Sequence, residues 1–447
     1  MLKSKYLKDL LVSCVEKNKN ELEFLQSIKL FFQSIDEVID YFPDIEGSGV
    51  LERFLEPERS IIFRVPWVDD QGIVQVNRGY RVQYNSAIGP YKGGLRFAEN
   101  VDLSVMKFLA FEQTLKNALT GLPLGGGKGG ADFSPLNKSA GEIMRFCQSY
   151  MGELYRHIGA SLDVPAGDYG VGPREIGYLF GYYKKLTNRF EGAITGRGLS
   201  YGGSLARPEA TGYGLCYFTL EMLKKYLKED FTNKRVIISG SGQVGANAAV
   251  KAFALGAKVI AMSDIDGVIY NPKGINVEKV HKLKTQHGSI LLYIQEDPNT
   301  VIYQKPEVLW EIACDIAFPC ATQNELGEAA AKALVKNGVK VVAEGANMPC
   351  TPEAISYLKE NNILFAPGKA ANAGGVAVSG LEMVQAALHY SWSFEEVNSK
   401  LEIIMKDIFN KVDDAAKRFG KAKDLSFGAN ITGFLKIYEA IQALGVV

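Results

Sequence analysis

One segment in the second half of the chain restricts the possible folds more than any other. The apolar run Arg235–Ser239 leads directly into Gly240-Ser241-Gly242-Gln243-Val244-Gly245, and the helix-forming run 246–252 follows at once. Asp264 stands about 20 residues further on, at the end of the next apolar run. A strand, a G-x-G-x-x-G turn, a helix and an acid in this order predict a βαβ unit that binds a dinucleotide. A helix–sheet contact without a ligand is the alternative interpretation of the same pattern.

The three glycines of this turn have different expected roles. Gly240 allows the tight turn, Gly242 lets the backbone approach a pyrophosphate, and Gly245 lets the helix pack closely on the strand. Gln243 and Val244 begin the helix, whose N-terminus attracts an anion. We therefore expect this segment to contact the cofactor.

The residues after the motif leave the choice of nucleotide open. Asp264 favours NAD if its carboxylate holds the ribose 2′-hydroxyl. A 2′-phosphate needs cations or small donors instead, and Ser263 and Lys284 could supply them. Either NAD or NADP is compatible with these three residues.

Around this motif, short apolar runs alternate with helical patterns. Such strands, separated by helices, indicate a parallel sheet covered on both faces. We therefore predict a Rossmann-type dinucleotide-binding domain over residues 201–425. The expected strands are 235–239, 258–262, 312–317, 340–344 and 363–366.

The N-terminal half has a different pattern. Residues 1–40 carry apolar side chains at helical spacing, whereas two runs with a period of two flank a polar turn and predict a hairpin. The expected hairpin strands are 61–65 and 73–84, and the expected later helices are 103–119 and 140–158.

These patterns divide the chain into two predicted domains. The fold class is α/β, with a mixed-sheet substrate-binding and oligomerisation domain over residues 1–200. The C-terminal segment 426–447 is expected to pack back onto this domain. The glycine-rich stretch 192–214 is the expected crossing between the domains.

Composition agrees with an ordinary globular protein of more than one domain. The chain has 447 residues, with 50 basic and 50 acidic side chains, so it lacks the basic surface that nucleic acid or an anionic membrane would need. Its six cysteines and four histidines show no metal-ligand spacing, and no metal site is expected. Scattered thiols and an N-terminus without a targeting pattern predict a cytoplasmic protein.

Lys128 is the first candidate catalytic residue, because it stands inside Gly125-Gly126-Gly127-Lys128-Gly129-Gly130. Glycines on both sides suggest a loop that leaves room for a small ligand on the amine. A phosphate-binding P-loop is excluded, because that pattern needs glycine at Leu122 and Ser or Thr at Gly129. A mobile loop with a solvated lysine is the alternative.

Further charged candidates lie on both sides of this segment. Lys92 stands in a second glycine cluster, and Gln113 and Lys116 share one face of the predicted helix. Asp168 follows in Pro165-Ala166-Gly167-Asp168, where a turn aspartate is the simpler interpretation. If Asp168 reaches Lys128, the two side chains form an acid–base pair suited to proton transfer.

With these residues in view, the chain resembles the hexameric glutamate dehydrogenases of the small bacterial and protist type, within the Glu/Leu/Phe/Val dehydrogenase family. The resemblance extends in order over almost the entire chain and rests on long motifs. The matching stretches are 89–97, 111–130, 165–172, 202–214, 343–349 and 366–380.

The resemblance implies specific substrate-binding and catalytic roles. Lys116 and Gln113 would bind the α-carboxylate of glutamate, and Lys92 and Ser379 the distal carboxylate. Lys128 would be the catalytic lysine, with Asp168 moving protons. The Gly167 backbone would also contact the substrate.

The resemblance also implies cofactor contacts. Thr211 and Gln243 would contact the cofactor, with Asn347 and Asn372 near the nicotinamide. The chain departs from the family at Tyr169, where isoleucine is usual, and at Gln243, where asparagine is common.

The implied reaction is the reversible oxidative deamination of L-glutamate to 2-oxoglutarate and ammonia. NADP is favoured and NAD is the alternative, in an ammonia-assimilating homohexamer. We expect Lys92 and Lys116 to crowd Lys128 and lower its pKa, so that its neutral amine can activate water.

Two other functions are considered. An amino-acid dehydrogenase for leucine, phenylalanine or valine binds a substrate with an apolar side chain. A second cation such as Lys92 would then have no substrate carboxylate to bind. A binding or regulatory protein that kept the fold would have no need of the full set of catalytic residues.

Overall fold

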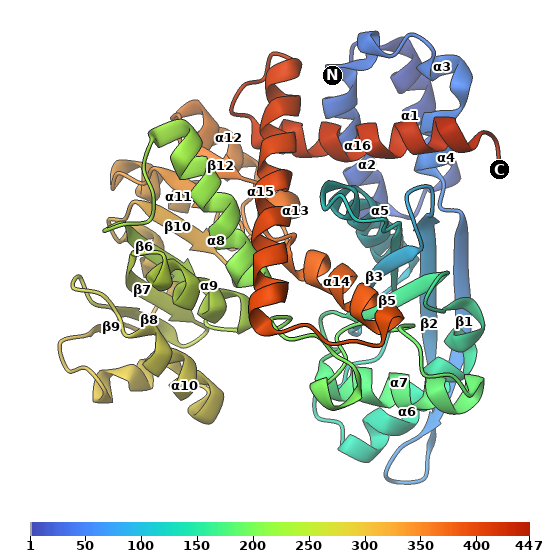
Figure 1. Cartoon of the computed structure of the whole chain (residues 1–447), viewed down its shortest axis with the longest axis horizontal. Coiled ribbons are helices and arrows are strands. Elements are labelled where there is room, and N and C mark those ends of the chain that lie inside the picture. Colours follow the sequence, from blue (N-terminus) through green and yellow to red (C-terminus); the bar gives the residue numbers. More distant parts are fainter. Residues whose placement is uncertain (1) are drawn as a thin grey trace. The chain divides into compact units, whose positions relative to one another are not determined.

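The computed structural model describes residues Leu2–Val447, which form two compact units (Figure 1). The first unit consists of the chain up to Leu205 together with Val378–Val397 and Asn430–Val447. The second consists of Ala206–Ala377 and Asn398–Ala429. The chain therefore enters the second unit twice and ends in the first.

Helices form the N-terminal part of the first unit. The predicted helical stretch is broken near residues 18–21, and apolar side chains of the second helix are buried at helical spacing. Phe31 contacts Phe111 and Phe434, with ring centroids 5.4 and 5.7 Å apart, so distant segments share one core. The helices are α1 (Lys5–Lys17), α2 (Leu22–Asp36), α3 (Ile45–Ser48) and α4 (Val50–Leu55), with a 3₁₀ turn at Ile39–Tyr41.

The first unit contains a five-stranded sheet in the order β1-β2-β4-β3-β5. Strands β1 and β2 form the predicted antiparallel hairpin, β2 pairs antiparallel with β4, and β3 lies parallel to both β4 and β5. The predicted mixed sheet is therefore confirmed. The strands are β1 (Arg59–Val68), β2 (Val74–Asn85), β3 (Tyr91–Phe97), β4 (Gly126–Ala131) and β5 (Asp163–Gly167).

Strands β3, β4 and β5 were not predicted, and the expected glycine loop around Lys128 is wrong because Lys128 lies within β4. These strands contain one β-branched residue, Val164, and show no regular apolar–polar alternation of the kind that marks a strand in the sequence. Glycine is required by close packing instead: a Cβ on Gly93 would collide with Gly127 O, and one on Gly130 with Arg96 O. Such contacts between backbones cannot be seen in the sequence.

Three helices cover this sheet. Helix α5 packs on β2 and β4, and α6 packs on β1 and α7. Both predicted helix starts carry caps, because Asp102 accepts from Val105 N–H at 2.8 Å and Ser139 with Glu142 forms a capping box. The helices are α5 (Leu103–Leu119), α6 (Ala140–Leu154) and α7 (Pro173–Thr187), with 3₁₀ turns at Tyr155–His157 and Leu199–Tyr201.

The second unit contains a seven-stranded sheet in the order β12-β11-β10-β6-β7-β8-β9. Strands β12 to β7 in that order are parallel, which confirms the Rossmann-type prediction, whereas β8 and β9 add an antiparallel edge that was not predicted. The strands are β6 (Arg235–Ser239), β7 (Lys258–Asp264), β8 (Gly267–Tyr270), β9 (Val301–Tyr303), β10 (Ile316–Pro319), β11 (Val341–Ala343) and β12 (Leu364–Ala366).

Along the chain, helices lie before, between and after the strands of this sheet. They are α8 (Ala210–Met222), α9 (Gln243–Ala254), α10 (Val277–His287), α11 (Glu328–Lys336), α12 (Pro352–Glu360) and α13 (Gly368–Ala371), with a π-helical turn at Leu223–Leu227 and 3₁₀ turns at Ile290–Gln295 and Pro306–Glu311.

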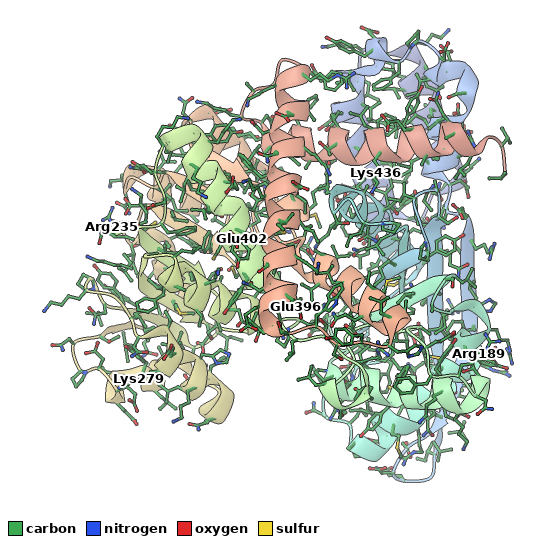
Figure 2. The ribbon with its side chains drawn as sticks, in the orientation of Figure 1. Arg189, Arg235, Lys279, Glu396, Glu402 and Lys436 are labelled. Atoms are coloured by element: carbon green, nitrogen blue, oxygen red, sulfur yellow. The ribbon has the colours of Figure 1, made fainter. Side chains whose placement is uncertain are left out.

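Three C-terminal helices have residues in both units. They are α14 (Gly374–Leu388), α15 (Phe394–Arg418) and α16 (Leu425–Leu444). Within the first unit, Lys436 of α16, labelled in Figure 2, donates to Leu122 O at 3.2 Å, and Asn430 donates to Ser34 Oγ at 2.9 Å. In residues 2–447, no helix has both the length and the apolar character needed to cross a bilayer.

Candidate active site

The first unit brings three charged side chains together. Lys128 Nζ lies 2.9 Å from Asp168 Oδ2, and Arg96 Nε donates to the same oxygen at 3.0 Å. Lys128 is 6% exposed, whereas the Asp168 side chain keeps 20% of its surface exposed. One carboxylate oxygen therefore faces two cations and is still accessible from outside.

The surroundings shift the pKa of both partners downward. Burial lowers the pKa of Lys128; Asp168 opposes this shift, and the positive charges of Arg96 and Arg81 add to it. Burial alone would raise the pKa of Asp168, but Lys128 and Arg96 hold it well below its usual range. Asp168 thus stays ionised, while Lys128 loses its proton more readily than a free lysine.

The expected cause of the Lys128 shift is therefore only partly right. The predicted direction agrees with the structure, but the cations that lower this pKa most are Arg96 and Arg81 rather than Lys92 and Lys116. Arg96 lies on β3 and Arg81 on β2, the two strands next to β4 in space. The sequence does not reveal this proximity.

The strand order explains why Lys128 and Asp168 meet. Gly129 of β4 pairs with Leu95 of β3, and Leu95 pairs in turn with Gly167 of β5. Asp168 follows directly after Gly167, so it leaves the sheet beside the strand that carries Arg96. A Cβ on Gly94 would lie 2.9 Å from Asp168 Cβ, so glycine there makes room for the aspartate.

The glycines around Lys128 do not serve the purpose expected of them. A Cβ on Gly126 would collide with Thr114 of α5, and one on Gly129 would lie 2.8 Å from Leu95 Cδ2. The chain's own atoms fill the space that the sequence suggested for a ligand. These glycines allow β4 to lie between α5 and its neighbouring strands.

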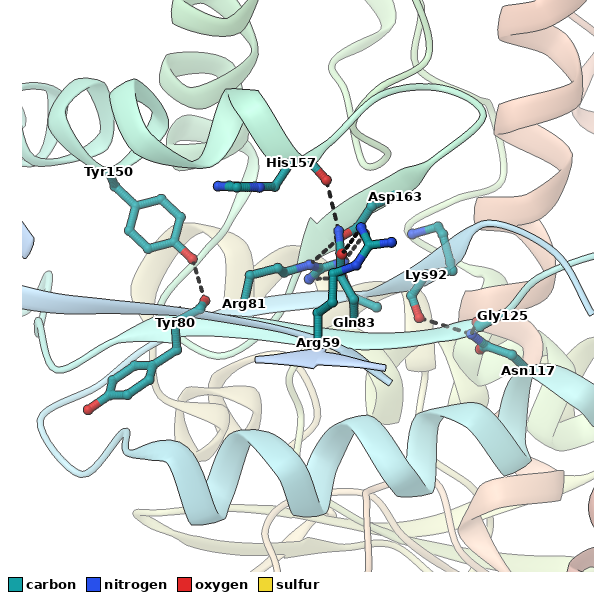
Figure 3. Close-up of polar contacts among 11 residues, drawn as sticks. Arg59, Tyr80, Arg81, Gln83, Lys92, Asn117, Gly125, Tyr150, His157 and Asp163 are labelled. Carbon is teal, nitrogen blue, oxygen red and sulfur yellow. Dashed lines mark hydrogen bonds and ion pairs between the residues drawn. The ribbon is translucent and has the colours of Figure 1, made fainter. Parts of the chain in front are cut away.

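Helix α5 adds amide contacts beside Lys92 (Figure 3). Gln113 Nε2 donates to Asn117 Oδ1 at 2.7 Å, and Asn117 Nδ2 donates to Lys92 O at 3.0 Å and to Gly125 O at 2.6 Å. Lys92 is only 1% exposed, and Lys116 lies in the last turn of the same helix. Asn117 thus links Gln113 to the backbone of the strand that carries Lys92.

Ser379 lies on the part of α14 that belongs to the first unit, and it is buried. A Cβ on the next residue, Gly380, would lie 2.6 Å from Leu122 Cδ1, so α14 approaches the segment that precedes β4. One turn later, Glu382 accepts from the Gly196 and Arg197 N–H groups at 2.9 and 3.2 Å. These contacts hold Ser379 in the unit that carries Lys92.

Sequence reasoning missed several residues of this region. Arg96 could have been found, because Lys92, Gly94 and Arg96 alternate onto one face of a strand. Asn117 and the buried Thr195, whose Oγ1 has no hydrogen-bond partner among residues 2–447, leave no comparable pattern. Their place depends on the tertiary fold.

The glycine turn of the second unit is built from backbone geometry. Gly240 has φ +74°, and Gly242 is the N-cap of α9 without a side-chain cap. A Cβ on Gly245 would collide with Gly240 O, so only glycine allows this close approach. Gln243 and Val244 are the first residues of α9, as expected from the sequence.

This turn fits a pyrophosphate. A Cβ on Gly242 would meet no atom within 4 Å, so there is open space at the N-terminus of α9. The buried Ser241 Oγ has no partner within residues 2–447 and can donate to a ligand. The uncapped N–H groups and the helix dipole complete a site for an anion.

Asp264 ends β7, but its carboxylate is already engaged. Oδ2 accepts from Lys284 Nζ and from Ile290 N–H, both at 2.9 Å, and Oδ1 accepts from Asp266 N–H at 2.8 Å. Ser263, beside it, is buried. The structure therefore pairs Lys284 with the acid itself, an arrangement that the sequence did not indicate.

The remaining cofactor candidates lie on loops and helix starts of the second unit. Asn372 Nδ2 donates to Asn347 Oδ1 at 2.9 Å and to Ala346 O at 3.0 Å. Thr211 lies in the first turn of α8, where a Cβ on Gly375 would come within 2.6 Å of its Oγ1. The structure thus joins Asn347 directly to Asn372.

Glu344, which sequence reasoning missed, holds these loops together. Its Oε2 accepts from Gly368 N–H at 2.6 Å and its Oε1 from Cys350 N–H at 3.2 Å. Burial raises the pKa of Glu344 to about 7, although the two N–H groups oppose this shift. Charged partners lower the pKa of Glu344 less than Lys128 and Arg96 lower the pKa of Asp168, so burial remains the larger influence on Glu344.

Comparison with known protein families matches both parts of the chain. The family described as Glutamate/Leucine/Phenylalanine/Valine dehydrogenase matches residues 202–445. The Glu/Leu/Phe/Val dehydrogenase dimerisation domain matches residues 57–185.

Similar proteins and solved structures extend over nearly the whole chain. An NAD-specific glutamate dehydrogenase of Bacteroides fragilis is 51% identical, covering 99% of this chain and 100% of that protein. An NADP-specific glutamate dehydrogenase of Haemophilus influenzae is also 51% identical, over 98% of each. The crystal structure of Plasmodium falciparum glutamate dehydrogenase is 47% identical, with a TM-score of 0.96, and covers 99% of this chain and 95% of that one.

Proposed function

Because the chain belongs to the Glu/Leu/Phe/Val dehydrogenase family, we propose that it catalyses the reversible oxidative deamination of L-glutamate to 2-oxoglutarate and ammonia, with hydride transfer to NAD(P). Relatives about half identical over the full chain carry this activity in their names. The observation in this structure that carries the proposal is the buried Lys128–Asp168 ion pair with Arg96 on the same oxygen. It supplies a proton acceptor and a stabilising acid in one place.

The charged groups of the first unit suit a dicarboxylic substrate. Lys116 and Gln113 bind the α-carboxylate, Lys92 and Ser379 bind the distal carboxylate, and the Gly167 backbone contacts the amino-acid moiety. Lys92 is buried, and a buried ammonium facing an apolar substrate side chain would be costly. Glutamate is therefore the substrate that this set favours over leucine, phenylalanine or valine.

The residues that bind the two carboxylates of glutamate hold its Cα, the reacting carbon, in place. When bound, the nicotinamide accepts the hydride that leaves Cα of glutamate, and the substrate becomes an imine. Lys128, with its lowered pKa, removes a proton from the water that attacks the imine carbon. The resulting ammonium of Lys128 then stabilises the oxygen of the carbinolamine.

Asp168 moves the second proton. While Lys128 is charged, it and Arg96 keep Asp168 ionised. When Lys128 is neutral, one of these two cations is lost, and the carboxylate gains proton affinity. As Lys128 becomes neutral, it gives the proton taken from water to Asp168, which passes this proton to the amine nitrogen. The neutral Lys128 then removes the hydroxyl proton of the carbinolamine as the C–N bond breaks and ammonia leaves.

The second unit supplies the residues that hold the dinucleotide. The turn Gly240–Gly245 and the N-terminus of α9 bind the pyrophosphate, with Ser241 Oγ as an added donor. Thr211 and Gln243 of this unit would contact the cofactor, and Asn347 and Asn372 would lie near the nicotinamide. Ser263 and Asp264 are near the adenosine ribose.

NADP is the favoured cofactor, with NAD as the alternative. Asp264 already accepts three hydrogen bonds, one of them from the Lys284 ammonium, so its carboxylate is partly neutralised and repels a 2′-phosphate less than a free acid would. Lys284 places a cation beside a 2′-phosphate, and Ser263 adds a small donor. Relatives of equal identity are named for NADP and for NAD.

The first unit is also proposed as the assembly domain of a homohexamer. Its sheet has β1 as an edge strand, and the β1–β2 hairpin exposes Ile62, Val74 and Val76. Exposed apolar side chains on an edge strand are typical of an interface. A related Thermus thermophilus glutamate dehydrogenase, 31% identical with a TM-score of 0.82, is described as hetero-hexameric.

The six cysteines are all free and buried, which suits the proposed cytoplasmic location.

Steady-state kinetics test the proposed function directly. The value of kcat/KM is expected to be at least about a hundredfold higher for glutamate than for leucine, because the distal carboxylate meets Lys92. It is also expected to be higher with NADPH than with NADH in the aminating direction. A preference for leucine, or the absence of turnover with either nucleotide, would contradict the proposal.

A further inference from the structure

A second ion pair lies inside the sheet that carries Lys128 (Figure 3). Arg81 and Asp163 are both fully buried, at 0% exposure. Arg81 Nε donates to Asp163 Oδ2 at 2.9 Å, and Nη2 pairs with Oδ1, so the guanidinium holds the carboxylate through two bonds. This pair has no part in the mechanism described above.

The pair connects three strands. Arg81 comes from β2 and Asp163 from β5, and Arg81 Nη1 also donates to Gly93 O of β3 at 3.1 Å. Gln83, two residues after Arg81, donates to Asp163 Oδ2 at 3.0 Å and to His157 O at 2.8 Å. The carboxylate of Asp163 thus receives bonds from two side chains of β2.

These contacts lie next to Lys128. In the sheet register, Arg81 pairs with Gly129, Val82 with Lys128, and Gln83 with Gly127. A Cβ on Gly129 would lie 3.0 Å from Arg81 Cδ, and one on Gly127 3.3 Å from Arg81 Nη2. Arg81 therefore lies against the two glycines that flank Lys128.

Lys128 itself lies on the other side of β4. Gly126, two residues before it, faces Thr114 of α5, and alternate residues of a strand face opposite sides. The guanidinium of Arg81 and the amine of Lys128 are therefore separated by one strand. Arg81, Arg96 and Asp168 are the charged groups that act on Lys128 from β2, β3 and the end of β5.

The pair also controls where Asp168 emerges. Asp163 begins β5 and Asp168 follows its last residue, Gly167. Next to Asp163, Val164 pairs with Lys92 of β3. A clamp on Asp163 therefore sets the register of the strand that delivers Asp168 to Lys128.

We propose that Arg81 and Asp163 are positioning residues for the deamination: together they lock β2, β3 and β5 around β4 and balance the charge beneath Lys128. This inference rests on the proposed function, because it assigns a role towards Lys128 and Asp168. Neither side chain is accessible to the substrate. Arg81 and Asp163 therefore affect the reaction only by holding strands β2, β3 and β5, and the residues on them, in position.

The test is the substitution Asp163→Asn in the full-length enzyme. The amide keeps the size of the side chain but leaves the Arg81 charge uncompensated, which lowers the pKa of Lys128 further. We expect kcat to fall roughly tenfold or more, as for a small misplacement of catalytic groups. We also expect the ascending limb of the pH profile of kcat/KM for glutamate to move to lower pH.

A control removes a more exposed arginine–aspartate pair in the second unit, whose side chains are 43% and 19% exposed. Arg235, labelled in Figure 2, donates to Asp315 through Nε at 3.2 Å and Nη2 at 3.3 Å. Asp315→Asn is expected to keep the wild-type kcat and pH profile. An unmoved profile in Asp163→Asn, or an equal shift in both variants, would overturn the inference.

A second variant keeps the test decisive if Asp163→Asn does not fold. Arg81→Lys retains the cation but cannot hold Asp163 through two bonds. We expect a roughly tenfold fall in kcat. Unchanged kcat in Arg81→Lys would overturn the inference.

The failure of this inference and the failure of the proposed function give different results. If Lys128→Ala remains active, the proposed function fails. If Lys128→Ala is inactive while the Asp163 and Arg81 variants behave as wild type, only the positioning role fails.

Discussion

Each unit has an acidic side chain at its candidate site, Asp168 partly buried in the first unit and Glu344 buried in the second, and the two acids have different surroundings. Asp168 in the first unit faces two cations, Lys128 at 2.9 Å and Arg96 at 3.0 Å. Glu344 in the second unit accepts from the backbone N–H groups of Cys350 and Gly368, and the charge of Lys369 is a lesser influence on its pKa. The pKa of Asp168 lies well below its usual range, whereas burial raises the pKa of Glu344 to about 7.

This difference follows from the chemistry that each unit performs. Moving protons to and from a substrate needs full charges that can exchange them, so the first unit places side-chain cations around an acid. Binding a dinucleotide needs N–H groups and close backbone approach, so the second unit relies on glycines and helix ends. Backbone dipoles compensate a buried carboxylate less than cations do.

The substitution with the largest expected effect disrupts the charge cluster of the first unit, which consists of Lys128, Asp168 and Arg96. Lys128→Ala removes the proton acceptor, so kcat should fall by about 10²–10⁴-fold while the protein remains folded. Steady-state assays and circular dichroism check this result. Lys138→Ala, an exposed lysine further along the same segment, should keep wild-type activity. Wild-type turnover in Lys128→Ala would exclude its assigned role.

The second prediction concerns Glu344, whose pKa is governed mainly by burial. Folded Glu344 has a pKa of about 7 against 4.5 for the free side chain, so the folded state holds its proton more tightly. The free energy of unfolding should therefore lose about 3 kcal/mol as pH rises from about 4.5 through about 7. Chemical denaturation at several pH values measures this slope.

Glu344→Gln should remove most of this pH dependence, because the amide does not titrate. The exposed Glu402→Gln on α15, labelled in Figure 2, should keep it. An identical slope in wild type and Glu344→Gln would show that another group is responsible.

The third prediction tests Asp264, a carboxylate of the second unit that pairs with a cation. Lys284→Met removes the partner of Asp264 and the cation for a 2′-phosphate, so the ratio of kcat/KM for NADPH over NADH should fall about tenfold. Lys279→Met, on the same helix and paired with Glu296, is the control and should keep the ratio. A ratio that rises in Lys284→Met would reverse the cofactor assignment.

The smallest expected effect concerns a neutral group beside the charges of the first unit. Ser379→Ala removes one hydrogen bond to the distal carboxylate, worth about 1 kcal/mol. KM for glutamate should rise a few-fold at nearly constant kcat, whereas norvaline, which has no distal carboxylate, should be unaffected. Equal changes for both substrates would place Ser379 outside the carboxylate pocket.

Much of the fold could be predicted from periodicity. The helix expected at residues 103–119 is observed as α5 with the same bounds, and the strands of the parallel sheet lie at or near their expected positions. Strands β3, β4 and β5 were missed, because their glycines serve close backbone packing and carry no alternating pattern. The antiparallel edge of β8 and β9 was missed as well, since both strands are short.

Some parts of the candidate site could also be predicted from the sequence, and others could not. The glycine turn before α9 could be recognised because strand, turn and helix are contiguous in the chain. Lys128 and Asp168 were named as candidates, but their ion pair depends on the pairing of β4, β3 and β5. Arg96 and Arg81 were not named, although they lower the pKa of Lys128.

The sequence by itself determined the α/β class, the dinucleotide motif and the residue types needed for deamination, because each of these is written in local order or in a motif. Only the tertiary structure decided that Lys128 lies in a strand, that its glycines contact the chain's own atoms, and that two arginines act on it. Electrostatic energy depends on distance in space and on burial, and neither is given by separation along the chain.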